Sequence, residues 1–448
     1  MMKIALINVS DPDRKVAMNK DLAGGMGTFS NFGVSLTSRL VSSMKKKSVK
    51  IPVLSYAYLQ GIFKKQGHEV DYIECADVDE IDDDYDLILI YGSIVDFKYE
   101  NEIGKKAREK CRKAKVGFFG TFPSVKPELF KCDFVLKGEA EGYFLYEFKK
   151  LEELKGVINI KKNVEMNDLP TPDYTGFPIQ EYSYFPAIKE KPFLVLQASR
   201  GCPYSCGYYC PYPTGQGSRY RIRDAEKIVD DIETMIKKYG VKGVQFRDPT
   251  FGLNKKQVED FIKLMKERNV KIKFGIETRL DLLNREMLKN LFDVGLRNLN
   301  IGVETMHEDV AKANKRMLID VQHQEDVILY CHKIGVKISA FYIFGLATDT
   351  EENIKKTVDY AIKLNTNVAQ FCISCPYPGT KYYDEVKEKG LLREEDFERF
   401  NSTSLVFEHN NLSAEKLMEL KEYAFKKYYF RPGYMANFLR WRVREFWL

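Results

Sequence analysis

Residues 199–213 read Ser199-Arg200-Gly201-Cys202-Pro203-Tyr204-Ser205-Cys206-Gly207-Tyr208-Tyr209-Cys210-Pro211-Tyr212-Pro213. The three cysteines recur at every fourth position, directly after an apolar run at 193–196 that predicts a buried strand. Three thiolates on one loop are able to bind three irons of a cubane iron–sulfur cluster, which leaves the fourth iron open to a non-protein ligand. The alternative is a loop with three unrelated thiols. A zinc site is disfavoured because it needs a fourth ligand and paired C-x-x-C knuckles.

This segment resembles the cluster loop of the radical S-adenosylmethionine (SAM) superfamily, and its residue sequence resembles that of the cobalamin-binding branch. The superfamily usually spaces its cysteines C-x-x-x-C-x-x-C, whereas this chain has C-x-x-x-C-x-x-x-C. The resemblance implies that Tyr209 takes the place of the aromatic residue near the adenine of SAM and that Tyr208 is an insertion. It also implies the cofactors: a [4Fe-4S] cluster on Cys202, Cys206 and Cys210, SAM, and cobalamin.

Composition limits the class of protein. A chain of 448 residues, 44% hydrophobic and 30% charged, has room for two or three domains of a soluble globular protein. No run approaches the ~18 apolar residues that cross a bilayer, and no signal peptide is recognisable, so we expect a cytoplasmic protein. The net charge of +6 permits an acidic partner without demanding one, and we expect no nucleic acid. Six cysteines outside the motif are read as core residues: Cys75, Cys111, Cys132, Cys331, Cys372 and Cys375.

Residues 1–165 alternate between strand and helix patterns. Strands are expected at 4–9, 70–73, 87–90, 116–119 and 134–136, with helices over 51–66 and 105–114. This order is typical of an open doubly wound parallel sheet of the Rossmann-like kind, in which ligands lie beyond the carboxyl ends of the strands. Small residues follow three of those ends: Gly92-Ser93, Gly120-Thr121 and Gly138-Glu139. Ordinary strand-to-helix turns are the alternative interpretation.

Considered together with the cysteine loop, this first domain resembles the cobalamin-binding domain that precedes the barrel in that branch. The motif D-x-H-x-x-G, which supplies a histidine to cobalt, is absent. His68 is the only histidine of the domain and is read as a surface residue, so we expect a cobalt without a protein imidazole. The resemblance implies cobalamin contacts from Gly92, Ser93, Gly120, Thr121, Phe122, Gly138 and Glu139.

The remainder of the chain predicts a linker, a barrel and a third region. A linker over 166–191 contains Asp168-Leu169-Pro170-Thr171-Pro172-Asp173, where two prolines favour extended backbone. From 192 to 383 the alternation runs six times, which predicts a partial (β/α)6 barrel with its chemistry at the carboxyl ends of the strands. The predicted strands are 193–196, 244–246, 272–276, 299–303, 336–344 and 368–374, and the predicted helices 224–239, 255–267, 284–294, 321–334 and 351–364.

Charged residues stand just past the predicted barrel strands. By analogy with the superfamily, the acidic side chains of Asp248, Glu277 and Glu304 meet the amino group or the ribose of SAM, and Arg279 meets its carboxylate or a neighbouring acid. Salt bridges at the mouth of the barrel are the alternative. Asp281 and Asp349 are read as helix-start caps. Tyr377, in Pro-Tyr-Pro-Gly-Thr, is the catalytic candidate, which either faces substrate or closes the barrel.

The C-terminal region, 384–448, is expected to be helical over 414–428. Residues 428–434 resemble a tail of branches that methylate hopanoids or act on tetrapyrroles. Residues 438–447 alternate between aromatic and basic, which suits either a peripheral contact with a membrane surface or an acidic partner, or packing of the rings on the barrel.

The resemblance implies C-methylation of an unactivated carbon through a 5′-deoxyadenosyl radical and methylcobalamin, with a flavodoxin or ferredoxin as electron donor. The substrate class stays open among a peptide or protein residue, a lipid and a metabolite. A non-methylating enzyme with the same cofactors, such as an oxidative cyclase or a rearrangement enzyme, is the first alternative. A non-catalytic cobalamin sensor is the second, and it is disfavoured because a sensor has no use for an open iron site.

Overall fold

A computed structural model describes residues 1–12, 20, 33 and 35–437. The first of its two large sheets is entirely parallel, with strand order β3-β1-β4-β5-β6-β7. The chain runs from β1 to β3 on one side and then crosses back past β1 to β4 on the other side, so the sheet has a switch point between β1 and β4, as in doubly wound folds. The strands are β1 Lys3–Val9, β3 Glu69–Cys75, β4 Leu87–Tyr91, β5 Lys115–Phe119, β6 Phe134–Lys137 and β7 Gly156–Asn159.

The helices of this domain differ in part from the predicted ranges. Helix α3 begins at Phe97, eight residues before the expected start, and ends at Lys110, because Phe97, Ile103 and Ala107 form one buried face. The sequence pattern did not predict β7, an edge strand with mostly exposed residues. The other helices are α1 Leu36–Ser48, α2 Leu54–Lys65, α4 Thr121–Val125 and α5 Ala140–Tyr146.

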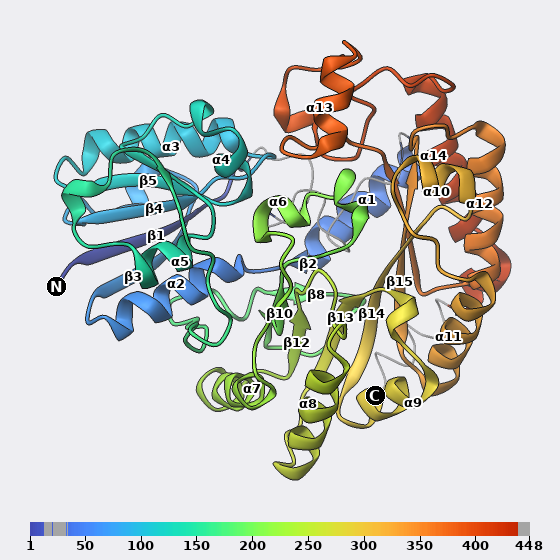
Figure 1. The fold of residues 1–448 in the computed structure, drawn as a ribbon, viewed down its shortest axis with the longest axis horizontal. Helices are drawn as coiled ribbons and strands as arrows, with labels where there is room; N and C mark the ends of the chain where they lie inside the picture. Colours follow the sequence, from blue (N-terminus) through green and yellow to red (C-terminus); the bar gives the residue numbers. More distant parts are fainter. Residues whose placement is uncertain (13–19, 21–32, 34, 438–448) are drawn as a thin grey trace.

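The second sheet is the predicted partial barrel. Its six parallel strands follow chain order, β9-β12-β13-β14-β15-β16, and within the described residues its two outer strands do not pair with each other. Helices cover its outer face (Figure 1). The strands are β9 Phe193–Leu196, β12 Gly243–Phe246, β13 Lys273–Thr278, β14 Leu296–Glu304, β15 Lys337–Phe344 and β16 Val368–Ile373, and the helices between them α7 Ala225–Tyr239, α8 Lys255–Glu267, α9 Arg285–Asp293, α10 Glu308–Ala313, α11 Val321–Ile334 and α12 Glu351–Leu364.

The segment between the two sheets is packed against both. Strand β8, Ser183–Tyr184, pairs with β2, Val49–Lys50, and the Tyr174 hydroxyl donates to Val195 O in the barrel at 2.7 Å. The segment thus joins the core instead of hanging between domains. Its predicted limits, 166 and 191, stay predictions.

The C-terminal region adds α13, Lys381–Glu388, above the mouth of the barrel and α14, Ala414–Tyr429, beside α12 (Figure 1). Helix α14 confirms the range expected for it to within one residue. The aromatic and basic stretch 438–447 lies outside the described residues. No helix in the described part of the chain is long and apolar enough to cross a bilayer.

Candidate active site

The cysteine loop begins where β9 ends and is closed by a small antiparallel pair, β10 Ser199–Arg200 with β11 Arg221–Ile222. Gly201 has φ +83°, and a Cβ on it would lie 2.0 Å from Arg219 O, so only glycine fits there. The loop turns through a short 3-10 helix, Ser205–Tyr208, and then into α6, Tyr212–Gln216. Backbone hydrogen bonds fix it, among them Cys210 N–H to Cys206 O at 2.9 Å.

All three cysteines of the loop line one open cavity at the carboxyl ends of the barrel strands. Among the described residues, no three His, Cys, Asp or Glu side chains converge as they would on a single ion. A cubane cluster sets a different requirement, because each cysteine binds a different iron. Burial raises the pKa of the Cys206 and Cys210 thiols, so a metal has to displace their protons on binding. One loop, one cavity and three sulfurs fit a cluster with an open iron.

Arg279 lies on the same cavity, at the end of β13. Its Nε and Nη2 donate to the two carboxylate oxygens of Asp281, each at 3.0 Å, and its guanidinium lies 4.2 Å from the centre of the Tyr204 ring. Its Nη1 is buried and makes no hydrogen bond within the described residues. A buried donor without a partner is costly, so Nη1 is suited to a ligand oxygen such as the carboxylate of SAM.

Glu304, at the end of β14, has φ +65°, which is uncommon for a residue with a side chain. Its Oε1 lies 3.7 Å from Nη1 of Arg316, and that Nη1 lies 3.4 Å from the Tyr209 hydroxyl. Burial raises the pKa of Glu304, although Arg316 and Arg279 act in the opposite direction. All three side chains line the cysteine cavity. The sequence analysis missed Arg316, since it follows α10 on a segment with no regular pattern and only its charge marked it.

Asp248 and Glu277 are fully buried and do not line this cavity. Asp248 accepts the Ser199 hydroxyl at 2.5 Å and the Ala198 N–H at 3.1 Å, and burial raises its pKa to about 7. Glu277 accepts the Tyr212 hydroxyl at 2.7 Å and pairs with Arg247. Both carboxylates hold the segments on either side of the cysteine loop. Their contact with SAM stays a prediction.

The predicted helix-start caps are wrong. Thr350 caps α12 by accepting from Asn353 N–H, while Asp349 before it accepts from Gly345 N–H at 3.1 Å. Asp281 pairs with Arg279 instead of accepting a helix N–H. The Asp349 carboxylate accepts its hydrogen bond within the turn before α12, and the Asp281 carboxylate accepts from the guanidinium of Arg279.

A second cavity lies between the two domains, beyond the carboxyl ends of β5 and β6. Gly120 and Gly138 line it with φ of +116° and +126°, and a Cβ on Gly120 would lie 2.8 Å from the Tyr91 ring. The predicted residues Thr121 and Glu139 line it as well. Glycine backbone at the carboxyl ends of these strands allows a bulky planar ligand to approach closely, which fits a corrin. Gly92 is not among the lining residues, and a Cβ on it would lie 2.4 Å from Pro123.

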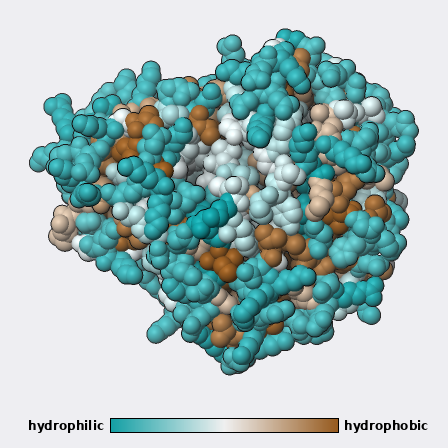
Figure 2. Space-filling model, viewed as in Figure 1, coloured by the Kyte–Doolittle hydropathy of each residue, from teal (hydrophilic) through white to brown (hydrophobic). Residues whose placement is uncertain are grey.

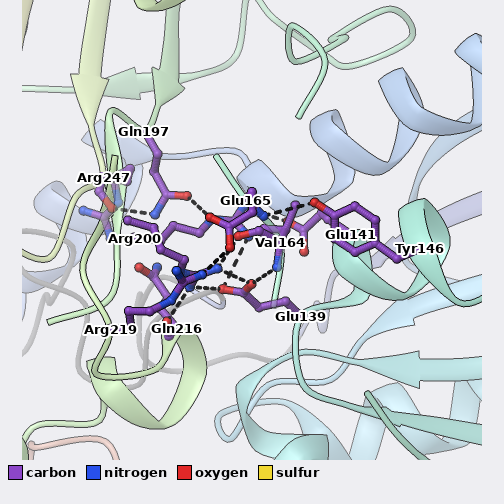
Figure 3. A network of polar contacts seen from close by, with 11 residues as sticks. Glu139, Glu141, Tyr146, Val164, Glu165, Gln197, Arg200, Gln216, Arg219 and Arg247 are labelled. Atoms are coloured by element: carbon purple, nitrogen blue, oxygen red, sulfur yellow. Dashed lines mark hydrogen bonds and ion pairs between the residues drawn. The ribbon is translucent and has the colours of Figure 1, made fainter. Parts of the chain in front are cut away.

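Buried charges cross the boundary between the domains beside this cavity (Figure 3). Glu139 accepts from both Nη atoms of Arg221 at 2.6 and 2.7 Å, and Glu141 accepts from Arg200 at 2.8 Å. Burial acts to raise the pKa of Glu141, but Arg200 outweighs it and the pKa is lowered. Arg200 lies two residues before Cys202, so its ion pair with Glu141 joins the cysteine loop directly to the first domain.

A third, smaller cavity adjoins the other two. Ser93, Thr121 and Phe122 line it from the first domain, and Pro211 and Tyr377 from the barrel. Thr121 also lines the interdomain cavity, while Pro211 and Tyr377 also line the cysteine cavity. The three cavities therefore lie in a row in which neighbouring cavities share wall residues. Figure 2 shows a pale area of intermediate hydropathy in the middle of the visible face, between the hydrophilic surfaces of the two domains.

None of the five histidines lines any of these cavities. His68 accepts from Met2 N–H at 3.3 Å, at the start of β1 and thus at the opposite edge of the sheet from Gly120. The other four each place Nε2 within 3.3 Å of a backbone carbonyl: His307, His323, His332 and His409.

Comparisons with known proteins agree with this geometry. A sequence profile of the Radical SAM superfamily matches residues 196–361. The chain is 27% identical to an uncharacterised methyltransferase of Pyrococcus horikoshii, over 85% of this chain and 88% of that one. It is 27% identical to the bacteriochlorophyllide d C-8(2)-methyltransferase of Chlorobaculum tepidum, over 76% and 77%.

The fold is similar to the radical SAM methyltransferase TsrM of Kitasatospora setae, solved with cobalamin and a [4Fe-4S] cluster. The TM-score is 0.63 at 15% identity, with 87% of this chain and 78% of that chain covered. The cysteine loop, the partial barrel that carries it and the matching profile together identify residues 196–361 as a radical SAM domain.

Proposed function

We propose that this enzyme is a cobalamin-dependent radical SAM C-methyltransferase. The observation that carries the proposal is the run of three cavities from the cysteine loop to the glycine-lined edge of the first sheet, in which Tyr377 and Pro211 face two cavities at once. A methyl transfer between two cofactors needs both of them to reach one substrate carbon, and this arrangement provides for that. The methyltransferases among the relatives support the same reaction class.

Different residues are proposed to bind the three cofactors. Cys202, Cys206 and Cys210 would hold the cluster, Nη1 of Arg279 would bind the carboxylate of SAM, and the Gly120 edge would take the corrin. Bound together, the cofactors supply a carbon radical generator and a methyl group, so the protein provides position and exclusion of water.

The cavity lining points to the kind of carbon that reacts. Charged side chains are confined to the side of β13 and β14, at Arg279, Glu304 and Arg316. The part of the lining from β15, β16 and the segments after them has no charged residue: it consists of Phe341, Ile343, Cys372, Ile373, Cys375 and Tyr377, with the uncharged polar residues Gln370, Ser374 and Ser402. A charged group on this side of the cavity would be buried without an oppositely charged residue in the lining. The reacting part of the substrate is therefore proposed to be uncharged and apolar, on a lipid, a planar metabolite or an apolar residue.

Reduction of the cluster needs an external one-electron donor, and a flavodoxin or ferredoxin is the proposed partner. Cys206 is half-buried, and its neighbours Pro203 and Ser205 are exposed, so the cysteine loop reaches the surface at this point. A donor docked there would approach the cluster without entering the substrate cavity.

The test is anaerobic incubation with SAM that carries a deuterated methyl group, a chemical reductant and pools of candidate apolar substrates. A methyltransferase of this type yields 5′-deoxyadenosine and S-adenosylhomocysteine in near-equal amounts, and the deuterated methyl appears on carbon in the product. A cyclase or rearrangement enzyme would yield 5′-deoxyadenosine with little S-adenosylhomocysteine, and a sensor would yield neither. Cys206→Ala should abolish both products, whereas Cys132→Ala, in the first domain, serves as the matched control.

A further inference from the structure

Tyr377 occupies a distinctive place in the row of cavities. Its side chain is 5% exposed and borders both the cysteine cavity and the small cavity that leads to the first domain. Pro211 is the other residue that borders both, and its ring has no polar group or freely rotating side chain. The aromatic ring of Tyr377 is thus a large part of the wall that the two cavities share.

The C-terminal region holds this ring in place. The Tyr377 hydroxyl lies 2.8 Å from Oγ of Ser402, and Cys375 lies within hydrogen-bonding reach of the same hydroxyl. Ser402 is itself fixed, because its carbonyl accepts from Ile373 N–H at 3.1 Å at the end of β16. Ser402 has φ +56°, a conformation that non-glycine residues adopt where the surroundings require it. A residue outside the barrel therefore determines where a cavity-lining ring stands.

We propose that Tyr377, anchored by Ser402, is a positioning residue that separates the SAM side of the active site from the cobalamin side. The inference rests on the proposed function for the assignment of the two cavities. A wall of this kind keeps a reactive species on the SAM side apart from the second cofactor until a substrate lies against the ring. Exclusion of unwanted encounters is one of the functions of a closed active site.

The test compares four variants after anaerobic reconstitution with cluster and cobalamin. Tyr377→Ala removes the wall, Tyr377→Phe keeps the ring and loses the anchor, and Ser402→Ala removes the anchor alone. Tyr382→Phe is the matched control, since Tyr382 is buried nearby in α13 but lines none of the three cavities. The readouts are the Co(II) electron paramagnetic resonance (EPR) spectrum with and without SAM, and 5′-deoxyadenosine released without substrate.

In the wild type and in Tyr382→Phe, SAM should leave the Co(II) spectrum unchanged. In Tyr377→Ala, SAM should alter that spectrum and substrate-free 5′-deoxyadenosine should rise several-fold. Tyr377→Phe and Ser402→Ala should change both readouts in the same direction by less. Added p-cresol, which fills the space of the missing ring, should return Tyr377→Ala toward wild-type behaviour. A Tyr377→Ala enzyme identical to the wild type, or a Tyr382→Phe enzyme altered equally, would overturn the proposal.

The two proposals fail in different ways. If the wild type binds no cobalamin, the proposed function is wrong. The separating role of Tyr377 is then decided on the cluster alone, by whether p-cresol changes the EPR spectrum of the SAM-bound cluster in Tyr377→Ala and not in the wild type. No such difference would reject the separating role.

Discussion

The Tyr208 hydroxyl donates a 2.8 Å hydrogen bond to Oε2 of Glu385 in α13, and the Tyr208 ring lies 5.6 Å from that of Tyr382. The next residue, Tyr209, instead borders the cysteine cavity. Tyr208, which the resemblance marks as the extra residue of the cysteine motif, does not line the cavity and ties the loop to the C-terminal region. This position explains how the longer spacing coexists with three cysteines on one cavity.

A double-mutant cycle with Tyr208→Phe and Glu385→Gln should measure this tie. We expect a coupling free energy of about 1 kcal/mol, the usual net value of one hydrogen bond at a partly exposed site. Thermal unfolding of the wild type, the two single variants and the double variant gives this coupling free energy. Both variants should keep the full iron content, because neither side chain lines the cavity. Loss of the cluster in Tyr208→Phe would show that the tie is needed for assembly as well as for stability.

Glu141→Gln tests the buried charges between the domains. Removal of Glu141 leaves the buried Arg200 with only the more distant carboxylate of Glu139, 3.8 Å from its Nη1, so the free energy of unfolding should fall by about 3 kcal/mol. Asp260→Asn, which breaks the exposed Lys256–Asp260 pair, should cost less than about 1 kcal/mol. Chemical denaturation of both variants beside the wild type gives the two values, and equal losses would contradict the account.

The same pair predicts a dependence of stability on pH. The pKa of Glu141 is lowered in the folded protein from an ordinary value of 4.5. The contribution of the pair is therefore fully present above pH 4.5 and is lost as the pH falls through the lower folded pKa. In acid, Glu141→Gln should lose less of its remaining stability than the wild type. Parallel acid curves for the two proteins would contradict this assignment.

Sequence periodicity predicted the elements that bury one regular face. The ranges 193–196, 255–267, 321–334 and 351–364 agree with the structure at both ends, because these elements carry unbroken apolar patterns and clear end signals, such as Gly335 in the left-handed conformation after α11. Strand β7 escaped prediction because its residues are mostly exposed at the edge of the sheet.

The site was predicted less completely than the fold. The three cysteines were found together because one loop carries them. Arg316 and Ser402 reach the cavity from segments far from the cysteines in sequence, and their positions depend on contacts with Gly302 and with the end of β16. The hydrogen bonds that Asp248 accepts from Ser199 and Ala198 likewise form only because β9 and β12 pair side by side. Such long-range contacts leave no local pattern.

Gly120→Ala tests the glycine edge of the interdomain cavity. The added Cβ would meet the Tyr91 ring at 2.8 Å in addition to its cost in a left-handed conformation, so cobalamin affinity should fall. Gly240→Ala is the control: its φ is +65°, it ends α7, and a Cβ there meets nothing within 4 Å. It should cost about 1 kcal/mol of stability and leave cobalamin affinity unchanged. Equal affinity in both variants, measured by equilibrium dialysis, would place the corrin elsewhere.

The positions of the histidines predict the spectrum of bound Co(II) cobalamin. His68 is at the far edge of the first sheet and the other four are held by backbone carbonyls, so the EPR spectrum should show no nitrogen splitting from a protein imidazole. His68→Ala should leave the spectrum unchanged. A splitting that disappears in this variant would mean that the first domain rearranges on cobalamin binding.

The most direct measurement of the central claim is metal analysis and EPR of the anaerobically reconstituted chain. We predict about four irons and four sulfides, a stoichiometric cobalamin, and a reduced-cluster signal that changes when SAM is added. The variant with Cys202, Cys206 and Cys210 all changed to Ala should lose the cluster signal and keep the cobalamin. A triple variant that retains its cluster would contradict the account, because the ligands would then lie among the other six cysteines.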